Sequence, residues 1–253
     1  MELAHPKRLK LQRNSSGRPD MALVAIACRV LESVLGSYLR EAGIPLILME
    51  YGLHRTPGLM ASALQQEIDR LTEPSIVILG YGLCGNGLVG LRARQHTLIV
   101  PRADDCITLL LGSYKRYAEE FSAEPGTYYL TKGWLASGSH PLREYQELLE
   151  KYDQETADWV IDQQYHNYQR LVFIASTQPE LDACRAQALE VASFCRARWG
   201  FRYEERIGST DLVNRLVDEA CQLRESTDDF LLIPPGGEIK QEAFWRGLRE
   251  SKQ

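Results

Sequence analysis

Residues 75–87 read SIVILGYGLCGNG, and this stretch is the clearest indication of the fold. It begins with an uninterrupted apolar run, which is typical of a strand buried on both faces of a parallel sheet. The glycine-rich turn that follows the run carries Cys84. Three further apolar runs have the same character: ALVAIAC at 22–28, PLILM at 45–49 and TLIV at 97–100. The N-terminal half therefore contains four expected strands of one buried sheet.

Segments with helical spacing separate most of these strands. Apolar residues recur every three or four positions between residues 30 and 42 and between residues 105 and 121. Residues 57–71 follow a threonine and start with a proline, a common beginning for a helix. This alternation of strands and helices predicts a doubly wound layer, with a parallel sheet in residues 21–121.

The second half of the chain resumes the pattern after a break at 124–139, EPGTYYLTKGWLASGS, which is rich in glycine and aromatic residues. A long polar helix is expected at 141–164. It is followed by strands at 170–176, 201–207 and 229–233 and by helices at 178–199 and 211–219. We therefore predict an α/β fold with two Rossmann-like layers. The expected domains are a frayed tail at 1–20, an N-terminal α/β domain at 21–140 that carries the cysteine site, and a C-terminal α/β half at 141–253.

Composition narrows the classes of function. The chain has 253 residues and a net charge of −5, which gives it no general attraction to nucleic acids or anionic membranes. No apolar run approaches the roughly 20 residues of a membrane span. The basic, polar N-terminus lacks the apolar stretch of a secretory signal, so a cytoplasmic location with reduced thiols is expected.

Three cysteines form the candidate site. Cys28, Cys84 and Cys106 each stand at or just beyond the carboxyl end of an expected strand. Ligands of open α/β sheets bind at this edge, where neighbouring parallel strands would bring the thiols together. Three thiolates could hold Zn²⁺ with one open position, or an iron–sulfur cluster with one open iron.

The alternative for these cysteines is plain core packing, because cysteine is among the most buried residue types and no CxxC motif is present. The other cysteines fall within or near the end of expected helices, and we interpret them as structural: Cys184, Cys195 and Cys221.

Polar residues near the same edge complete the candidate site. His54 is the candidate catalytic residue, as a general acid or base or a metal ligand, although a histidine at a helix start can also bond only to backbone. Four arginines could form a rim that binds carboxylate or phosphate groups, or could simply be solvated: Arg55, Arg92, Arg94 and Arg102.

The glycine-rich turn itself is a second candidate for ligand binding. Gly82, Gly85 and Asn86 could cradle an anion or let a bulky ligand approach the backbone. The turn lacks the lysine and serine of a Walker motif, and Asn86 followed by glycine is also typical of a simple tight turn.

Several long motifs resemble one known family. These motifs are GLHRTP at 52–57, ILGYGLCGNGLVGLRAR at 78–94, VPRADDCITLLLGS at 100–113, EPGTYYLTKGWL at 124–135 and PGGEI at 235–239. They resemble the bacterial and archaeal family of domain of unknown function 1638. Its members look similar in keeping the three cysteines, and they often occur beside corrinoid-dependent methyl-transfer systems.

Two kinds of function remain open at this point. In the first, the three cysteines bind zinc or an iron–sulfur cluster and activate a bound thiol or water, which would suit a metal-dependent methyltransferase or an accessory protein of methyl transfer. In the second, the cleft binds a corrinoid or a similar small anionic ligand without catalysis, and a corrinoid protein is a possible partner. A structural partner in a larger complex is a third alternative.

Overall fold

The computed structural model describes residues 21–53 and 56–245. Its larger sheet has five strands in the order β2-β1-β3-β4-β8. The four expected strands of the N-terminal half are all present: β1 (Ala22–Cys28), β2 (Leu46–Met49), β3 (Ser75–Gly80) and β4 (Thr97–Pro101). They pair in parallel, so the prediction of a parallel sheet in this half is confirmed.

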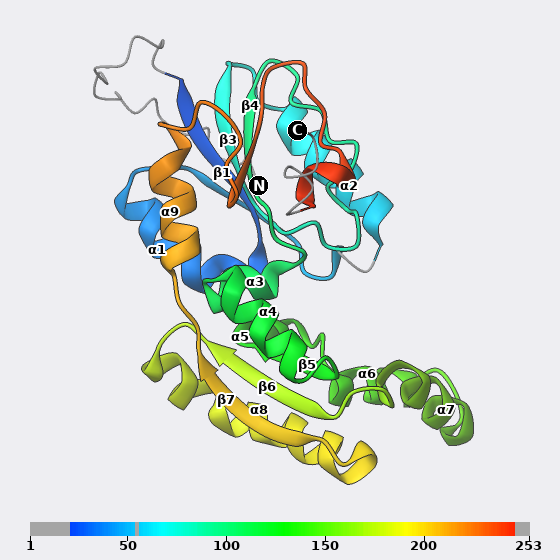
Figure 1. Ribbon diagram of the computed structural model, residues 1–253. Helices are drawn as coiled ribbons and strands as arrows, with labels where there is room; N and C mark the ends of the chain where they lie inside the picture. Colours follow the sequence, from blue (N-terminus) through cyan, green and yellow to red (C-terminus); the bar gives the residue numbers. More distant parts are fainter. Residues whose placement is uncertain (1–20, 54–55, 246–253) are drawn as a thin grey trace, which may run out of the picture.

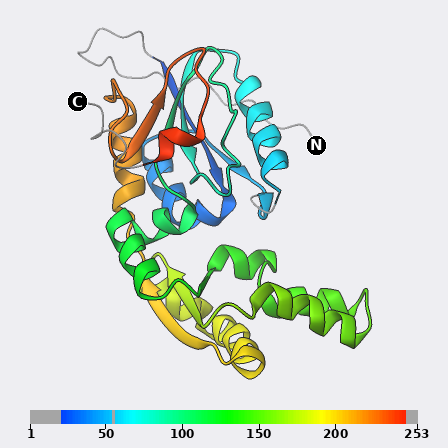
Figure 2. The ribbon, with the colours of Figure 1, turned by 45° about the vertical axis from the view of Figure 1, so that its right-hand side comes forward.

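Helices cover both faces of this sheet. The short 3₁₀ helix η1 (Arg29–Leu31) leads into α1 (Glu32–Glu41), which contacts α9 (Asp211–Ala220) on one face. Helix α2 (Pro57–Asp69) lies on the opposite face (Figures 1 and 2). The buried, continuously apolar sequences of β3 and β4 are explained by this double covering.

The smaller sheet has three parallel strands in the order β5-β6-β7. These strands are β5 (Thr127–Thr131), β6 (Arg170–Ala175) and β7 (Arg202–Ile207). The long helix α8 (Gln178–Trp199) packs on β6 and β7. Three more helices belong to this layer: α5 (Lys132–Ser137), α6 (Pro141–Leu149) and α7 (Gln154–Tyr165).

The connection between the layers is helical. Helices α3 (Cys106–Leu111) and α4 (Tyr114–Ala123) replace the single helix expected at 105–121, because Gly112 adopts a left-handed φ of 74° and ends the first of them. Helix α4 is joined to the smaller sheet by a salt bridge of 2.8 Å between Glu120 and the buried Arg170. The helix expected at 141–164 is likewise two helices, α6 and α7.

The layers do not divide near residue 140, where the sequence suggests a boundary. Strand β5 already belongs to the smaller sheet, whereas the chain later returns to the larger sheet with α9 and with β8 (Phe230–Ile233). Strand β8 pairs with β4 in the antiparallel direction. The smaller layer is therefore an insertion between β4 and α9, and the chain ends its described part with the 3₁₀ helix η3 (Gln241–Phe244).

The direction of the strands determines on which side of the larger sheet the candidate site lies. The four parallel strands of the larger sheet, β1 to β4, run toward the smaller layer, so their carboxyl ends face it (Figure 1). Each sheet has its own hydrophobic cluster, and the larger cluster also includes Val172 and Ile174 from β6. The loops after β1, β3 and β4 thus lie at the junction of the two layers.

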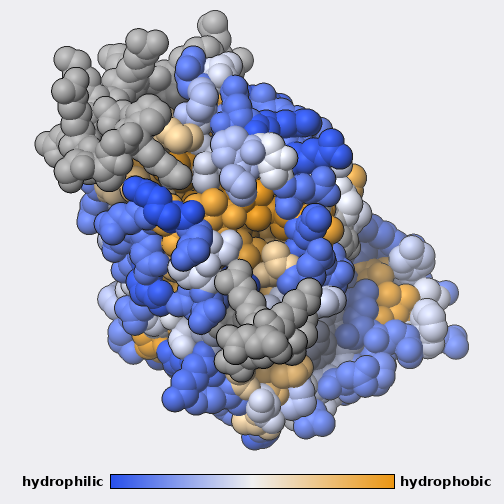
Figure 3. Space-filling view, turned by 45° about the horizontal axis from the view of Figure 1, so that its top comes forward, coloured by the Kyte–Doolittle hydropathy of each residue, from blue (hydrophilic) through white to orange (hydrophobic). Residues whose placement is uncertain are grey.

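The surface seen in Figure 3 is largely hydrophilic, with an area of hydrophobic side chains near its centre. No helix in the described ranges is both long and apolar enough to cross a membrane.

Candidate functional site

The three cysteines lie at the expected edge of the larger sheet. Cys28 is the last residue of β1 and is buried, Cys84 is half-buried in the loop after β3, and Cys106 is the buried first residue of α3. All three have free thiols. Each one reaches this edge because its strand runs in the same direction as the others.

The loop that carries Cys84 is fixed against the loop that precedes Cys106. The Leu83 N–H donates to the carbonyl oxygen of Ala103 over 2.7 Å, and the Cys84 N–H donates to that of Asp104 over 2.8 Å. Gly82 is necessary for this approach, since a Cβ atom there would lie 2.6 Å from backbone atoms of Asp105.

The turn then continues through a left-handed backbone. Cys84, Gly85 and Asn86 have φ values of 48°, 65° and 72°. A cysteine with positive φ is uncommon and costs conformational energy, which the surrounding contacts must outweigh. The turn therefore holds the Cys84 thiol at a place that a relaxed extended backbone would not give it.

Burial controls the protonation of these thiols. It is the main reason that the pKa of Cys84 is raised to about 12, with further contributions from Asp105 and Cys28. The pKa of Cys106 is raised by burial and by Cys84, Asp105 and Cys28, and burial also raises that of Cys28. The three groups therefore share one electrostatic environment, and without a bound cation they are neutral thiols.

Two backbone hydrogen-bond donors nevertheless face the sulfur of Cys84. The backbone N–H groups of Gly82 and Cys106 face it and act to lower its pKa, although burial outweighs them. Such donors stabilise a thiolate more than a thiol. N–H groups directed at cysteine sulfurs are also among the interactions that tune metal–thiolate centres.

Tyr81 is the most unusual neighbour of the thiols. Its side chain is 2% exposed, and its hydroxyl has no hydrogen-bond partner among the described residues. Burial raises the pKa of Tyr81, and the charges of thiolates at Cys28, Cys84 and Cys106 would raise it further. The phenol is therefore a protonated donor without an acceptor, and it lies within electrostatic range of all three cysteines.

The thiols do not form a finished metal shell. Within residues 21–53 and 56–245, no group of three or more His, Cys, Asp or Glu side chains is close enough together to hold a metal ion. Binding a metal would require the side chains of Cys28, Cys84 and Cys106 to turn toward one another.

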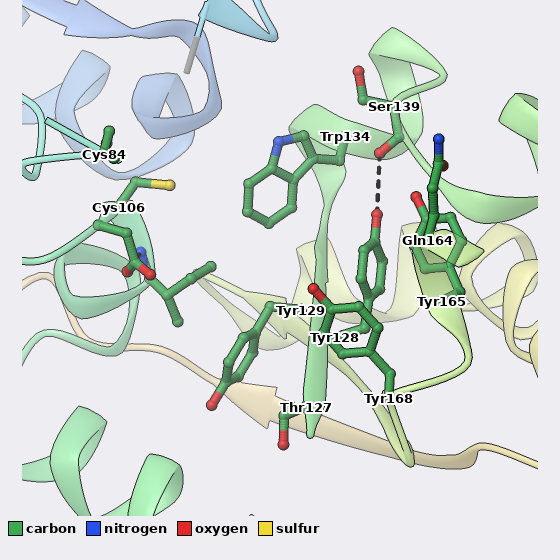
Figure 4. A pocket seen from close by; sticks show the side chains of 13 residues that line it. Cys84, Cys106, Thr127, Tyr128, Tyr129, Trp134, Ser139, Gln164, Tyr165 and Tyr168 are labelled. Atoms are coloured by element: carbon green, nitrogen blue, oxygen red, sulfur yellow. Dashed lines mark hydrogen bonds between the residues drawn. The ribbon is translucent and has the colours of Figure 1, made fainter. Parts of the chain in front are cut away.

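A cavity of about 570 Å³ opens in front of two of the cysteines. Cys84, Gly85, Asp105 and Cys106 line it from the larger layer, whereas Cys28 is not part of its lining. The smaller layer supplies the opposite wall, which is mainly aromatic: Tyr128, Tyr129, Trp134, Tyr165 and Tyr168. Figure 4 shows Trp134 between the cysteines and the group formed by Tyr128, Tyr165 and Tyr168.

The aromatic wall is held in place by its own contacts. The ring of Tyr128 is nearly perpendicular to those of Tyr165 and Tyr168, with centroids 5.5 and 5.6 Å away. The Tyr165 hydroxyl donates to Glu144 over 2.6 Å, and the Tyr128 hydroxyl donates to the carbonyl oxygen of Ser139 over 3.4 Å (Figure 4). The rings therefore form a preorganised wall.

The arginines named in the sequence analysis are not part of this cavity lining where the structure describes them. Arg92 pairs with Glu238 over 3.3 Å, and Arg94 pairs with Asp69 over 3.0 Å near the end of α2. The long connection after β3 must return to the opposite edge before β4 begins, and it carries both residues away from the thiols. Buried Arg102 donates to the carbonyl oxygen of Ala243 over 2.9 Å.

Of the residues predicted in the glycine-rich turn, one lines the cavity and two do not. Gly85 lines the cavity, whereas Gly82 and Asn86 shape the turn. His54 and Arg55 lie outside the described residues.

The cysteines interpreted as structural lie away from the cavity lining. Cys184 and Cys195 belong to the core of the smaller layer, and Cys221 follows the last residue of α9. Asp105 caps α3 by accepting a 2.9 Å hydrogen bond from the Ile107 N–H.

The aromatic wall was missed by sequence reasoning. Three of its rings, Tyr128, Tyr129 and Trp134, come from the segment 124–139, which the sequence analysis describes as a break in the pattern of strands and helices. The signal that could have identified the wall is the density of aromatic residues in TYYLTKGW, which is unusual for a connecting segment.

The fold and the site together define a two-sheet α/β protein with a cavity between the sheets, thiols on one wall and aromatic rings on the other. Residues 48–217 match the model of the family described as protein of unknown function DUF1638, and the chain belongs to this family. Searches of curated proteins and of solved structures found no match.

Proposed function

We propose that this protein binds one metal centre, zinc or an iron–sulfur cluster, through Cys28, Cys84 and Cys106. The observation that carries the proposal is the unpaired hydroxyl of Tyr81, which is buried within electrostatic range of all three thiols. A buried hydroxyl without a partner costs about 1–3 kcal/mol. Thiolates that turn toward this hydroxyl on metal binding would supply the missing acceptor, and a bound metal is the usual means of keeping buried thiolates charged.

The donor set agrees with this proposal. Sulfur ligands favour zinc and iron–sulfur clusters over magnesium or calcium. The N–H groups of Gly82 and Cys106 at the Cys84 sulfur would favour its charged form. Three protein ligands leave one metal position for an exogenous ligand, and the cavity beside Cys84 and Cys106 gives such a ligand a route to it.

The proposed chemistry follows from that open position. A metal centre of this kind lowers the pKa of a bound thiol or water and makes it a nucleophile. Around it, Cys84 and Cys106 would fix the centre at the cavity wall, and the aromatic rings would exclude water from the reacting group. The reaction class that we favour is transfer of a methyl group from a methylated donor to a bound thiolate: the bond between the donor and the methyl group breaks, the S–CH3 bond forms, and the demethylated donor leaves. This protein would be the enzyme or its accessory.

Elemental analysis of protein purified without oxygen tests the metal site. We expect about one zinc ion or one cluster per chain. Replacing Cys28, Cys84 or Cys106 by serine should remove most of the metal, since a hydroxyl is a poor ligand for these soft centres. The half-buried Cys221 is the matched control, and Cys221→Ser should keep the metal.

Two results would reject the proposal. One is folded protein without metal after anaerobic purification and reconstitution with zinc and with iron and sulfide. The other is full metal content in all three serine variants. Metal-free protein that retains a small molecule through purification would support the second candidate function instead, a non-catalytic binder of a corrinoid or a similar ligand.

A further inference from the structure

The electrostatic character of the cavity differs from that of an anion site. Among the residues that the structure describes, no lysine, arginine or histidine lines it. Its ionisable groups are the carboxyl group of Asp105, the thiols of Cys84 and Cys106, and tyrosine hydroxyls. Every one of these groups is either neutral or negatively charged at any pH, so the lining offers no charge that would attract an anion.

A metal centre would strengthen this preference. The three thiolates outnumber the positive charge of a divalent ion, so a zinc centre at Cys28, Cys84 and Cys106 stays anionic. The carboxyl group of Asp105 lines the same cavity wall as Cys84 and Cys106. The acidic groups of the cavity therefore lie on the wall of the larger layer, opposite the aromatic rings.

The aromatic wall supplies several rings to a single cavity. Tyr128 is nearly perpendicular to Tyr165 and Tyr168, and Trp134 closes the side toward the cysteines (Figure 4). Aromatic faces carry partial negative charge and attract a cation that lies over them, and rings of different orientation in one cavity can offer such a cation more than one face. Buried tyrosine Tyr165 and half-buried Trp134 would also remove water from it.

We propose that this cavity binds a small organic onium ion, with its methylated quaternary ammonium or sulfonium group enclosed by Trp134, Tyr128 and Tyr168. An onium group has no N–H bonds to satisfy, which suits a wall made mostly of rings rather than hydrogen-bond acceptors. The inference rests on the proposed function in that it names the ligand class of the same cavity, and it replaces the anionic ligand suggested by the sequence.

Choline and its neutral carbon analogue, in which a tert-butyl group replaces trimethylammonium, separate charge from shape. Calorimetric titration of the metal-free native protein should give about tenfold tighter binding of choline, since cation–π attraction is worth roughly that factor. Replacing Trp134 by leucine should weaken choline binding about tenfold and leave the neutral analogue nearly unaffected. Trp159 in α7, which is 64% exposed and outside the lining, is the control, and Trp159→Leu should bind choline like the native protein.

Equal binding of the two ligands, or binding of neither, would overturn the inference. The native-protein comparison decides this even if Trp134→Leu fails to fold, which circular dichroism would reveal. Metal content, measured separately, distinguishes the two proposals. Choline selectivity without any metal would reject the metal site alone, and a full metal site without choline selectivity would reject the onium site alone.

Discussion

The backbone N–H of Cys84 donates to the carbonyl oxygen of Asp104 over 2.8 Å. This bond joins the loop after β3 to the loop after β4, two residues before Cys106. The main-chain hydrogen bond therefore holds the loops of Cys84 and Cys106 together whether or not a ligand is bound. The site depends on how closely these two loops can approach.

Gly82 controls that approach, and Gly82→Ala should separate the loops. The new methyl group would lie 2.6 Å from the Asp105 backbone, so one loop must move. We expect a loss of about 1–3 kcal/mol in the free energy of unfolding, measured with urea, and a loss of bound metal. Gly58 in α2 is the control because a Cβ there meets nothing within 4 Å. Gly82→Ala protein with native stability and metal content would show that the loops tolerate the separation.

Tyr81→Phe should have opposite effects on the two forms of the protein. Without metal, removal of the unpaired hydroxyl should raise the free energy of unfolding by about 1 kcal/mol or more. With metal, loss of a donor to the thiolates should weaken binding roughly 10- to 100-fold, as found for interactions behind metal ligands. Thermal unfolding and competition with a chelator measure the two effects. A metal-free variant less stable than the native protein would contradict the assignment.

Metal binding should release protons. The pKa values of Cys28, Cys84 and Cys106 are raised, mainly by burial, so the metal-free thiols are protonated at pH 7. Thiolate ligation then displaces about three protons per metal. Calorimetric titrations in two buffers with different ionisation enthalpies measure this number. Release of about one proton or fewer would mean that the three thiols are not all ligands.

The same thiols predict how stability depends on alkaline pH. A cysteine whose folded pKa is raised favours folding while it is protonated, and this stability is lost as pH rises through the folded pKa. For Cys84 the window runs from about 9 to about 12. Metal-free protein should therefore lose stability across this range. Metal-loaded protein, whose thiolates already carry no proton, should lose much less in the same unfolding experiment.

Glu120 should make the protein sensitive to acid. Burial acts to raise its pKa, but hydrogen bonds and charges from Arg206 and Arg170 outweigh burial and hold the pKa below 4.5. Because the folded pKa is lowered, the stability is present above about 4.5 and is lost as pH falls through the folded value. Glu120→Gln should cost about 1–3 kcal/mol at pH 7 and reduce the loss on acidification. The exposed Glu119 is the control, and Glu119→Gln should change stability by less than about 0.5 kcal/mol.

The sequence was sufficient for the larger sheet because its strands are continuous apolar runs. The same reasoning placed Cys28, Cys84 and Cys106 at one edge, since parallel strands end on the same side. It missed β5, whose sequence TYYLT mixes polar and aromatic residues and whose flanks resemble a loop. It also could not show that β8, predicted correctly as a strand, pairs in the antiparallel direction.

The cavity was beyond sequence reasoning for a related reason. Its two walls come from segments that are distant in the chain, and only the packing of one layer on the other brings Trp134 opposite Cys106. Arg94 shows the opposite error, because the sequence analysis placed it near the thiols and it does not line the cavity. It follows β3 in the chain, but the connection crosses the whole layer before β4 and places Arg94 beside Asp69.

The late return of the chain to the larger sheet has a consequence during synthesis. Strand β4 has buried residues Leu98, Ile99 and Val100, and its partner β8 follows more than a hundred residues later. Until the ribosome has released Phe230–Ile233, the outer edge of β4 has no partner from its own sheet. An apolar strand with a free edge is prone to pair with other chains. A nascent chain stalled before residue 230 should therefore depend on chaperones more than the finished protein does.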